Sequence, residues 1–251
     1  MNPCLVVKGL SKSFGDLKAV DAVSFTVHER EVFGIVGPNG AGKTTLFNSI
    51  TGLPFRADAG VVEFLGTDIS QMPPREIFQQ GLARTFQRES VFESLSVEES
   101  LWVGGVYGTR RMRGRELRAA AGRVAERLGL TGSMQAISRD MPLFEKKKLM
   151  IGTALMGEPR LLMLDEPVAG LNPSEADSIA DLIASLRGEG LTVVVIEHVL
   201  PVLFRVSDRV LAMDAGASIA LGPPAEIRVN AEVIRAYLGN SAESLGDAAG
   251  G

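Results

Sequence analysis

The stretch GPNGAGKTT (37–45) has the residue types and the spacing of a loop that binds phosphate groups. It follows the apolar run VFGIV (32–36) and precedes the helix-compatible run TTLFNSI, so it joins a strand to a helix. Its glycines let backbone N–H groups turn inward around phosphate oxygens, and the following helix adds its positive N-terminal end. The competing interpretation is a glycine-rich turn that contains Gly-Lys-Thr by coincidence, and the flanking strand and helix argue against it.

The polar residues at the end of this loop are expected to hold a triphosphate and a metal ion. Lys43 is expected to reach the β- and γ-phosphates, Thr44 to ligate Mg²⁺ and Thr45 to hydrogen-bond the α-phosphate. The residues of this loop that are predicted to bind the nucleotide are Gly37, Pro38, Asn39, Gly40, Ala41, Gly42, Lys43, Thr44 and Thr45.

Two adjacent carboxylates, Asp165 and Glu166, end a second apolar run, LLMLDEP (161–167). In parallel sheets, ligand chemistry gathers at the carboxyl ends of the strands. Asp165 is expected to hold Mg²⁺ directly or through water, and Glu166 to orient and deprotonate an attacking water. By itself, Asp-Glu-Pro after a strand is an ordinary helix-start signal, and it is the phosphate loop earlier in the chain that favours catalysis.

Two further side chains are candidates because of the elements around them. His198 follows the apolar run LTVVVIE (191–197), so it would lie at the same sheet edge as Lys43 and Asp165 and could contact the γ-phosphate. A histidine in this position is otherwise a structural group. Gln87, in ARTFQRES, is a weak candidate by itself, and it becomes a candidate only because the chain also contains the phosphate loop and the other residues named above.

The elements that must position these residues form an α/β pattern. From residue 31 onward, short runs rich in Val, Ile and Leu alternate with helix-length segments, which is typical of a mainly parallel sheet. Before residue 31, alternating CLVVKGL and AVSFTV predict antiparallel strands. Between about 96 and 157, helix formers dominate and predict a helical insertion, with Gly129 at a helix C-terminus.

Composition excludes several other classes of protein. The chain has 251 residues, of which 45% are hydrophobic, and so can fill a globular core. A net charge of −4 argues against generic binding to nucleic acid. The single cysteine, Cys4, permits no internal disulfide, the start of the chain lacks a secretion signal, and no apolar run is long enough to span a bilayer. We therefore expect a cytosolic protein whose contact with any membrane runs through another protein.

Over nearly its whole length the sequence resembles the ATP-binding subunits of ABC transporters. In that family GPNGAGKTT corresponds to the Walker A loop and LLMLDE to the Walker B strand, Gln87 to the Q-loop residue, AGLN (169–172) to the D-loop and His198 to the switch histidine. The resemblance implies that ATP and Mg²⁺ are the cofactors, that Glu166, His198 and Gln87 are catalytic, and that Gln87 joins Thr44 and Asp165 around the metal. Phe14 stands where the family stacks an aromatic ring on adenine, although a buried core phenylalanine is the competing interpretation.

The resemblance also implies an architecture. A P-loop NTPase domain would cover residues 1–240, with an antiparallel β-subdomain at 1–30 and about 60–70, a helical subdomain at about 90–157, a RecA-like core in the remainder and a flexible tail at 241–251. Two such subunits would close head to tail over two ATP molecules and act on two transmembrane permease subunits, and indirectly on a solute-binding protein. The chain would then be peripheral, at the cytoplasmic face of the inner membrane.

Within the family, the phrases GLARTFQ, EPVAGLNPSE and VIRAYLG resemble subunits that drive uptake of branched-chain and related hydrophobic amino acids. An exporter, such as a lipopolysaccharide-type system, stays open because the energy module does not encode direction. So does a scaffold that binds ATP without cleaving it. A DNA-maintenance ATPase is disfavoured, since those proteins usually carry a long coiled coil between the two nucleotide motifs.

One motif departs from the family. The signature is normally Leu-Ser-Gly-Gly-Gln at a helix N-terminus, and this chain has MPLFE (141–145) in its place. Pro142 lacks both a hydroxyl and an N–H donor, Phe144 puts a ring where backbone would approach a phosphate, and Glu145 adds a negative charge. Further along, Thr153 replaces a usual arginine.

The altered signature predicts a heterodimer. A homodimer would contain two damaged sites, whereas a partner ATPase subunit with an intact signature would restore one of them. The alternative is that backbone N–H groups at the helix start suffice, with Lys146, Lys147 and Lys148 supplying compensating positive charge.

Overall fold

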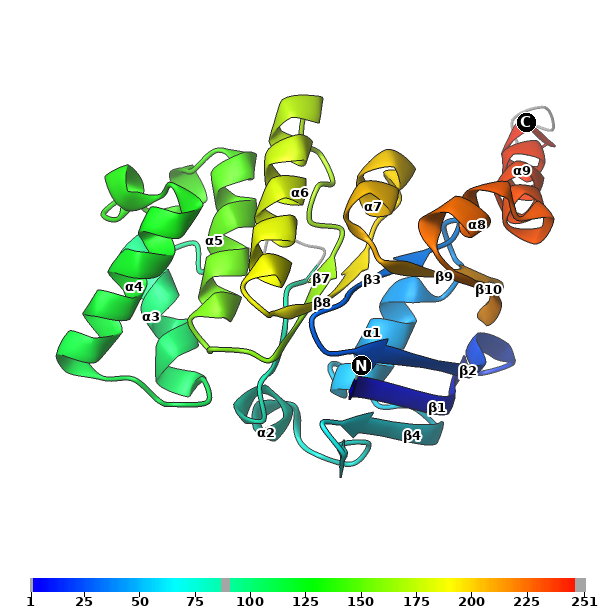
Figure 1. Ribbon diagram of the computed structural model, residues 1–251, viewed down its shortest axis with the longest axis horizontal. Helices are drawn as coiled ribbons and strands as arrows, with labels where there is room; N and C mark the ends of the chain where they lie inside the picture. Colours follow the sequence, from blue (N-terminus) through cyan, green and yellow to red (C-terminus); the bar gives the residue numbers. More distant parts are fainter. Residues whose placement is uncertain (1, 87–90, 247–251) are drawn as a thin grey trace. The chain divides into compact units, whose positions relative to one another are not determined.

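The computed structural model describes residues 2–86 and 91–246 (Figure 1). The chain forms two compact units. The first unit is built from Met1–Met72 and Val195–Gly251, and the second from Pro73–Val194. The candidate Gln87 lies outside the described residues.

An antiparallel sheet occupies the N-terminal part of the first unit. Its strand order is β2-β1-β4-β5. The strands are β1 (Pro3–Phe14), β2 (Leu17–His28), β4 (Ala59–Phe64) and β5 (Thr67–Asp68). Buried and exposed residues alternate along β2, because one face of the sheet packs on the core and the other faces water. The prediction of antiparallel strands from CLVVKGL and AVSFTV is confirmed.

The rest of the first unit contains a buried parallel pair. β3 (Val32–Val36) is buried along its whole length and runs parallel to β9 (Arg209–Asp214), while β10 (Ala217–Gly222) pairs with β9 in the antiparallel sense. Four helices complete the unit: α1 (Lys43–Thr51), α7 (Leu200–Val206), α8 (Pro224–Val229) and α9 (Ala231–Gly246). Helix α9 runs on into the segment 241–251 that the sequence predicts to be a tail. β8 (Thr192–Ile196), also buried throughout, crosses the boundary between the units.

The second unit combines a short parallel pair with helices. β6 (Leu82–Arg84) runs parallel to β7 (Leu161–Asp165). The helices are α2 (Pro74–Gln79), α3 (Val97–Tyr107), α4 (Gly114–Leu128), α5 (Leu143–Leu155) and α6 (Pro173–Gly188), with 3₁₀ turns at Thr131–Ser133 and Ser138–Asp140. Gly129 ends α4 in the left-handed conformation, which confirms the predicted helix end. Among the described residues no helix has the length and apolarity needed to cross a membrane.

Helices α3, α4 and α5 pack around a shared apolar core (Figure 1). Close approach between α3 and α5 depends on Gly104, where an added Cβ would lie 1.9 Å from the carbonyl oxygen of Thr153. Likewise, a Cβ on Gly152 would lie 2.5 Å from Leu128 of α4. Small residues therefore set the spacing of the three helices.

Replacing Gly104 with alanine should lower the free energy of unfolding by about 1–3 kcal/mol, because the new methyl group overlaps backbone that has to move. Urea denaturation of the purified chain measures this. The matched control is Gly122→Ala on α4, where the added Cβ meets nothing within 4 Å and should raise stability by about 0.5–1 kcal/mol. Equal effects of the two substitutions would contradict the close packing at Gly104.

Candidate functional site

The phosphate-type loop joins β3 to α1 and is stabilised by its own lysine. Lys43 is only 7% exposed, and its Nζ donates hydrogen bonds to the carbonyl oxygens of Gly37 at 2.7 Å and Pro38 at 2.9 Å. Gly40 and Gly42 adopt φ values of 82° and 91°, which side-chain-bearing residues rarely adopt. Hydrogen bonds from the Lys43 ammonium group to two carbonyl oxygens of the loop therefore hold the loop in its curved shape.

Neighbouring backbone leaves no room for side chains at two of the loop glycines. A Cβ on Gly42 would lie 2.1 Å from the carbonyl oxygen of Ala19 in β2, and a Cβ on Gly37 would lie 2.3 Å from that of Met213 in β9. The loop is therefore held between the two sheets of the first unit. Helix α1 begins directly after it with Thr44 and Thr45 half-buried in the first turn, which carries no acidic residue. Such a helix start attracts anions through its N–H groups and its dipole.

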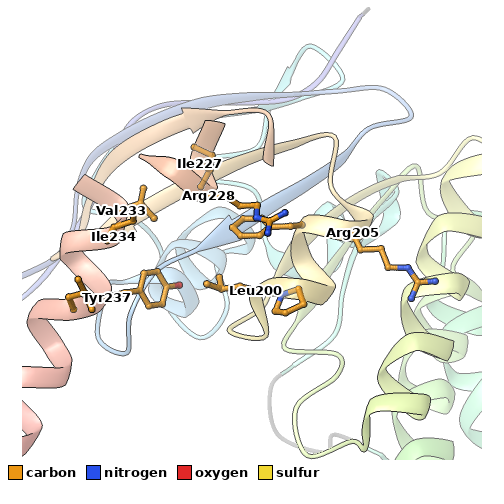
Figure 2. A pocket seen from close by; sticks show the side chains of 10 residues that line it. Leu200, Arg205, Ile227, Arg228, Val233, Ile234 and Tyr237 are labelled. Carbon is orange, nitrogen blue, oxygen red and sulfur yellow. The ribbon is translucent and has the colours of Figure 1, made fainter. Parts of the chain in front are cut away.

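Helix α9 contacts this loop through Tyr237. Burial raises the pKa of the Tyr237 hydroxyl to about 12, and the nearby backbone N–H of Gly37 partly opposes that shift. Tyr237 also lines a mostly apolar groove of about 740 Å³ between α7, α8 and α9. Figure 2 shows Tyr237 and Leu200 pointing toward one another across it, with Arg205 pointing away.

Phe14 lies at the end of β1 with its side chain outside the core. It is 47% exposed, so the competing interpretation of a buried core phenylalanine is wrong. Its ring meets Phe55 edge to face with centroids 5.1 Å apart, and the Lys12 ammonium lies 5.4 Å from its centroid. An exposed, oriented ring is available for stacking on a flat ligand.

His198 follows β8 on an exposed site, so it is not a buried structural histidine. Its backbone N–H donates to Oε2 of Glu197 at 3.2 Å. Glu197 itself is fully buried. The imidazole is therefore presented to solvent at the carboxyl end of a strand.

The two carboxylates of LLMLDEP lie in the second unit. Asp165 is 1% exposed, and its Oδ2 accepts a hydrogen bond from the Arg84 guanidinium at 2.9 Å across β6 and β7. Burial lowers the pKa of Arg84, and the negative charge of Asp165 opposes that shift. A buried carboxylate ion is thus paired with a buried cation.

Glu166 follows in a turn with φ of 50°. The chain then turns over residues 167–170, and α6 begins only at Pro173, where Asn172 and Glu175 form a reciprocal capping box. The interpretation of Asp-Glu-Pro as a helix start is therefore wrong. The carboxylate of Glu166 stands on a strained turn, a kind of backbone that clusters at functional sites.

Three residues that contact these elements do not stand out in the sequence: Arg84, Lys147 and Tyr237. Arg84 stands in ARTFQ three residues before Gln87, and an arginine ending an otherwise apolar strand was the available signal. Lys147 is expected from the sequence only to add compensating charge with Lys146 and Lys148, although helical spacing aligns it with the buried Ile151. Tyr237 offered no local signal.

Comparison with known proteins decides the family. The family model described as "ABC transporter" matches residues 20–169, which contain both the phosphate loop and the Asp165–Glu166 pair. The chain belongs to the ABC transporter ATPases. A second family model, "Branched-chain amino acid ATP-binding cassette transporter", matches residues 218–243, which include α8 and much of α9.

Relatives align with this ABC ATPase over nearly all of their length. It is 38% identical over 253 residues to the high-affinity branched-chain amino acid transport ATP-binding protein BraF of Pseudomonas aeruginosa, covering 95% of the chain and 99% of the relative. It is 34% identical over 236 residues to the lipopolysaccharide export system ATP-binding protein LptB of Haemophilus influenzae, covering 94% and 97%. Among solved structures, an ATP-binding cassette of an ABC transporter in its ADP conformation has a TM-score of 0.87 at 31% identity, covering 95% of this chain and all (100%) of that one.

Each unit of this ABC ATPase contributes an oxygen donor of a kind suited to a magnesium ion. Among the described residues, no group of three or more His, Cys, Asp or Glu side chains could hold a metal ion by itself. Mg²⁺ usually takes one or two protein oxygens and completes its shell with water and substrate phosphates. The Thr44 hydroxyl and the Asp165 carboxylate are oxygen ligands of the kind it prefers.

Replacing Arg84 with methionine should lower the free energy of unfolding by about 3–5 kcal/mol, because it leaves the Asp165 carboxylate buried without its ion-pair partner. Chemical denaturation of the purified chain measures the change. Arg127→Met, which removes a surface pair with Glu189, is the matched control and should cost no more than about 1 kcal/mol. Similar small losses in both variants would show that the Arg84–Asp165 pair stabilises the fold no more than a surface ion pair does.

Proposed function

We propose that this ABC ATPase powers an importer for branched-chain or related hydrophobic amino acids. The observation that carries the proposal is the match of residues 218–243 to the branched-chain family model, because this segment lies outside the nucleotide-binding motifs. The identity to BraF over almost the full length supports the same substrate class. Identity to LptB at a similar level keeps export as the second candidate.

ATP hydrolysis in this proposal divides between named side chains. The Lys43 ammonium and the backbone N–H groups of Gly40 to Thr45 bind the phosphates, and Phe14 stacks on the adenine. Thr44 and Asp165 would hold Mg²⁺, which would supply positive charge to neutralise the phosphate oxygens. Glu166 orients the attacking water and takes its proton, and His198 contacts the γ-phosphate. Gln87, which lies outside the described residues, would be a further ligand to that metal, as the resemblance implies.

Glu166→Gln should lower the ATPase rate of the assembled complex by about 10²–10⁴-fold, because the amide cannot accept the proton of the attacking water. Nucleotide binding should persist, since the phosphate loop is untouched. Lys43→Ala is the complementary variant, and there we expect nucleotide binding itself to be lost. An unchanged ATPase rate in Glu166→Gln would reject the catalytic assignment and favour a scaffold that binds ATP without cleaving it.

The structure of the altered signature supports the proposed heterodimer. α5 begins at Leu143, with Pro142 as an extended N-cap that offers no side-chain hydrogen bond. Phe144 is in the first turn with the Lys148 ammonium 4.7 Å from its ring centroid, and the Glu145 carboxylate accepts a hydrogen bond from Ser133 at 3.3 Å. A helix start of this composition is poorly suited to receive a partner's γ-phosphate.

The alternative is that backbone N–H groups at the start of α5 suffice, with the three lysines of the helix supplying compensating positive charge. Lys147 and Lys148 are both engaged within the chain. Lys147 is buried, and its ammonium group donates a hydrogen bond to a backbone carbonyl oxygen. The ammonium group of Lys148 lies over the ring of Phe144. Burial lowers the pKa of Lys148, and the negative charge of Glu145 opposes that shift. This favours a partner ATPase subunit with an intact signature over a symmetric homodimer.

Restoring the signature with Pro142→Ser and Phe144→Gly should raise ATP turnover in the assembled complex. The gain should reach up to about 10²-fold if one aimed phosphate donor is recovered. The matched control, Pro142→Ala with Phe144→Leu, removes the same side chains without adding the hydroxyl or the glycine and should gain little. No difference between the two double variants would contradict the idea that this helix start is defective.

The membrane subunits are proposed to dock on a groove in the second unit. This groove, of about 320 Å³, lies between α2, α3, α5 and the segment that follows β6. Its lining includes the exposed aromatic side chains Phe92 and Tyr107, which are 44% and 54% exposed. An apolar groove rimmed by aromatic residues suits a short helix from a permease. The chain would thereby be peripheral at the cytoplasmic face of the membrane, with the solute chosen by other subunits.

A further inference from the structure

Lys147 has surroundings unlike those of an ordinary surface lysine. It is only 5% exposed, and its Nζ donates a hydrogen bond at 3.0 Å to the backbone carbonyl oxygen of Glu166. The same oxygen accepts a hydrogen bond at 3.3 Å from the N–H of Ala169. One carbonyl group is thus held both by helix α5 and by the turn that follows β7.

This carbonyl belongs to a strained residue. With φ of 50°, Glu166 occupies a region that residues with a Cβ seldom enter, and such backbone persists only where its surroundings hold it. The φ and ψ angles of a residue fix the direction of its Cα–Cβ bond. A group that fixes the carbonyl of Glu166 therefore also restricts where its carboxylate can point.

We propose that Lys147 is a positioning residue for Glu166, and that it couples helix α5 to the carboxylate that activates water. The proposal rests on the catalytic role of Glu166 under the proposed function. Burying an ammonium group is costly, and a methionine of similar length would fill the same space without that cost. A lysine rather than a methionine at this buried position is explained if the hydrogen bond of its ammonium group to the Glu166 carbonyl has a function.

A second contact joins α5 to the same turn. A Cβ added to Gly170 would lie 2.9 Å from Cδ2 of Leu143, so the first residue of α5 packs directly against the AGLN segment (169–172). Ala169, which shares the Glu166 carbonyl with Lys147, is the first residue of that segment. A displacement of α5 would therefore be transmitted to the Glu166 turn at two points. The helix that carries the altered signature thus also sets the geometry of the water-activating group.

The test is Lys147→Met in the complex purified with its partner subunits. We expect kcat for ATP hydrolysis to fall by about 10–100-fold, the effect of misplacing a catalytic group by roughly 1 Å. KM for ATP and the unfolding temperature should not change. Lys147→Arg, which keeps a charged donor, should recover most of the rate. The matched control is Lys8→Met, which removes an exposed ammonium group paired with Glu63 and should leave kcat as it is.

A double variant separates positioning from a merely structural role. If Lys147 acts only through Glu166, then adding Lys147→Met to Glu166→Gln should lower the residual single-turnover rate no further. Losses that multiply would overturn the proposal, as would a normal kcat in Lys147→Met alone. Should Lys147→Met unfold, Lys147→Gln is to be measured under the same criteria. An unchanged ATPase rate in Glu166→Gln would instead remove the catalytic role of Glu166 under the proposed function, on which this inference rests.

Discussion

A charge that leaves water must be matched by a nearby group, because its desolvation costs more than folding can absorb elsewhere. The motif elements of this chain meet that requirement in both units. The Lys43 ammonium lies on the carbonyls of Gly37 and Pro38, the Asp165 carboxylate on the Arg84 guanidinium, and the Lys147 ammonium on the carbonyl of Glu166. Each pairing holds a strand end or a loop in the shape its chemistry requires.

The N-termini of helices α1 and α5 differ in how well their backbone N–H groups can bind an anion. At α1, glycines packed tightly against Ala19 and Met213 leave bare backbone N–H groups ahead of a first turn without acidic residues. At α5, a proline, a leucine, a phenylalanine and a glutamate stand at the positions where the family signature has a serine, two glycines and a glutamine. The first start is suited to anions and the second is not, although both are helices of ordinary geometry. The asymmetry gives the proposed heterodimer its physical basis.

The lysines of α5 also illustrate how misleading a run of charges can be. Three consecutive lysines suggest a solvated face, yet the middle one is buried. Because successive residues on a helix point about 100° apart, one of three neighbours can face the interior while the others remain nearer to solvent. The buried one reaches a carbonyl 19 positions later in the chain.

The sequence by itself determined the parts that depend on local spacing. The phosphate loop, the buried strands at 32–36 and 209–214, the antiparallel hairpin and the helix end at Gly129 all follow from residues close together in the chain. The family followed from the same motifs. These features are readable because backbone preference and hydrophobic period act over a few residues.

Tertiary structure alone decided how the charged groups are paired and which side chains face water. Arg84 meets Asp165 across 81 positions, and Phe14 meets the ring of Phe55 while its side chain stays 47% exposed. The turn at Glu166 replaces the helix start that its local sequence suggested, because α6 takes its cap from Asn172 instead. Such pairings depend on the packing of distant segments, and no local pattern encodes them.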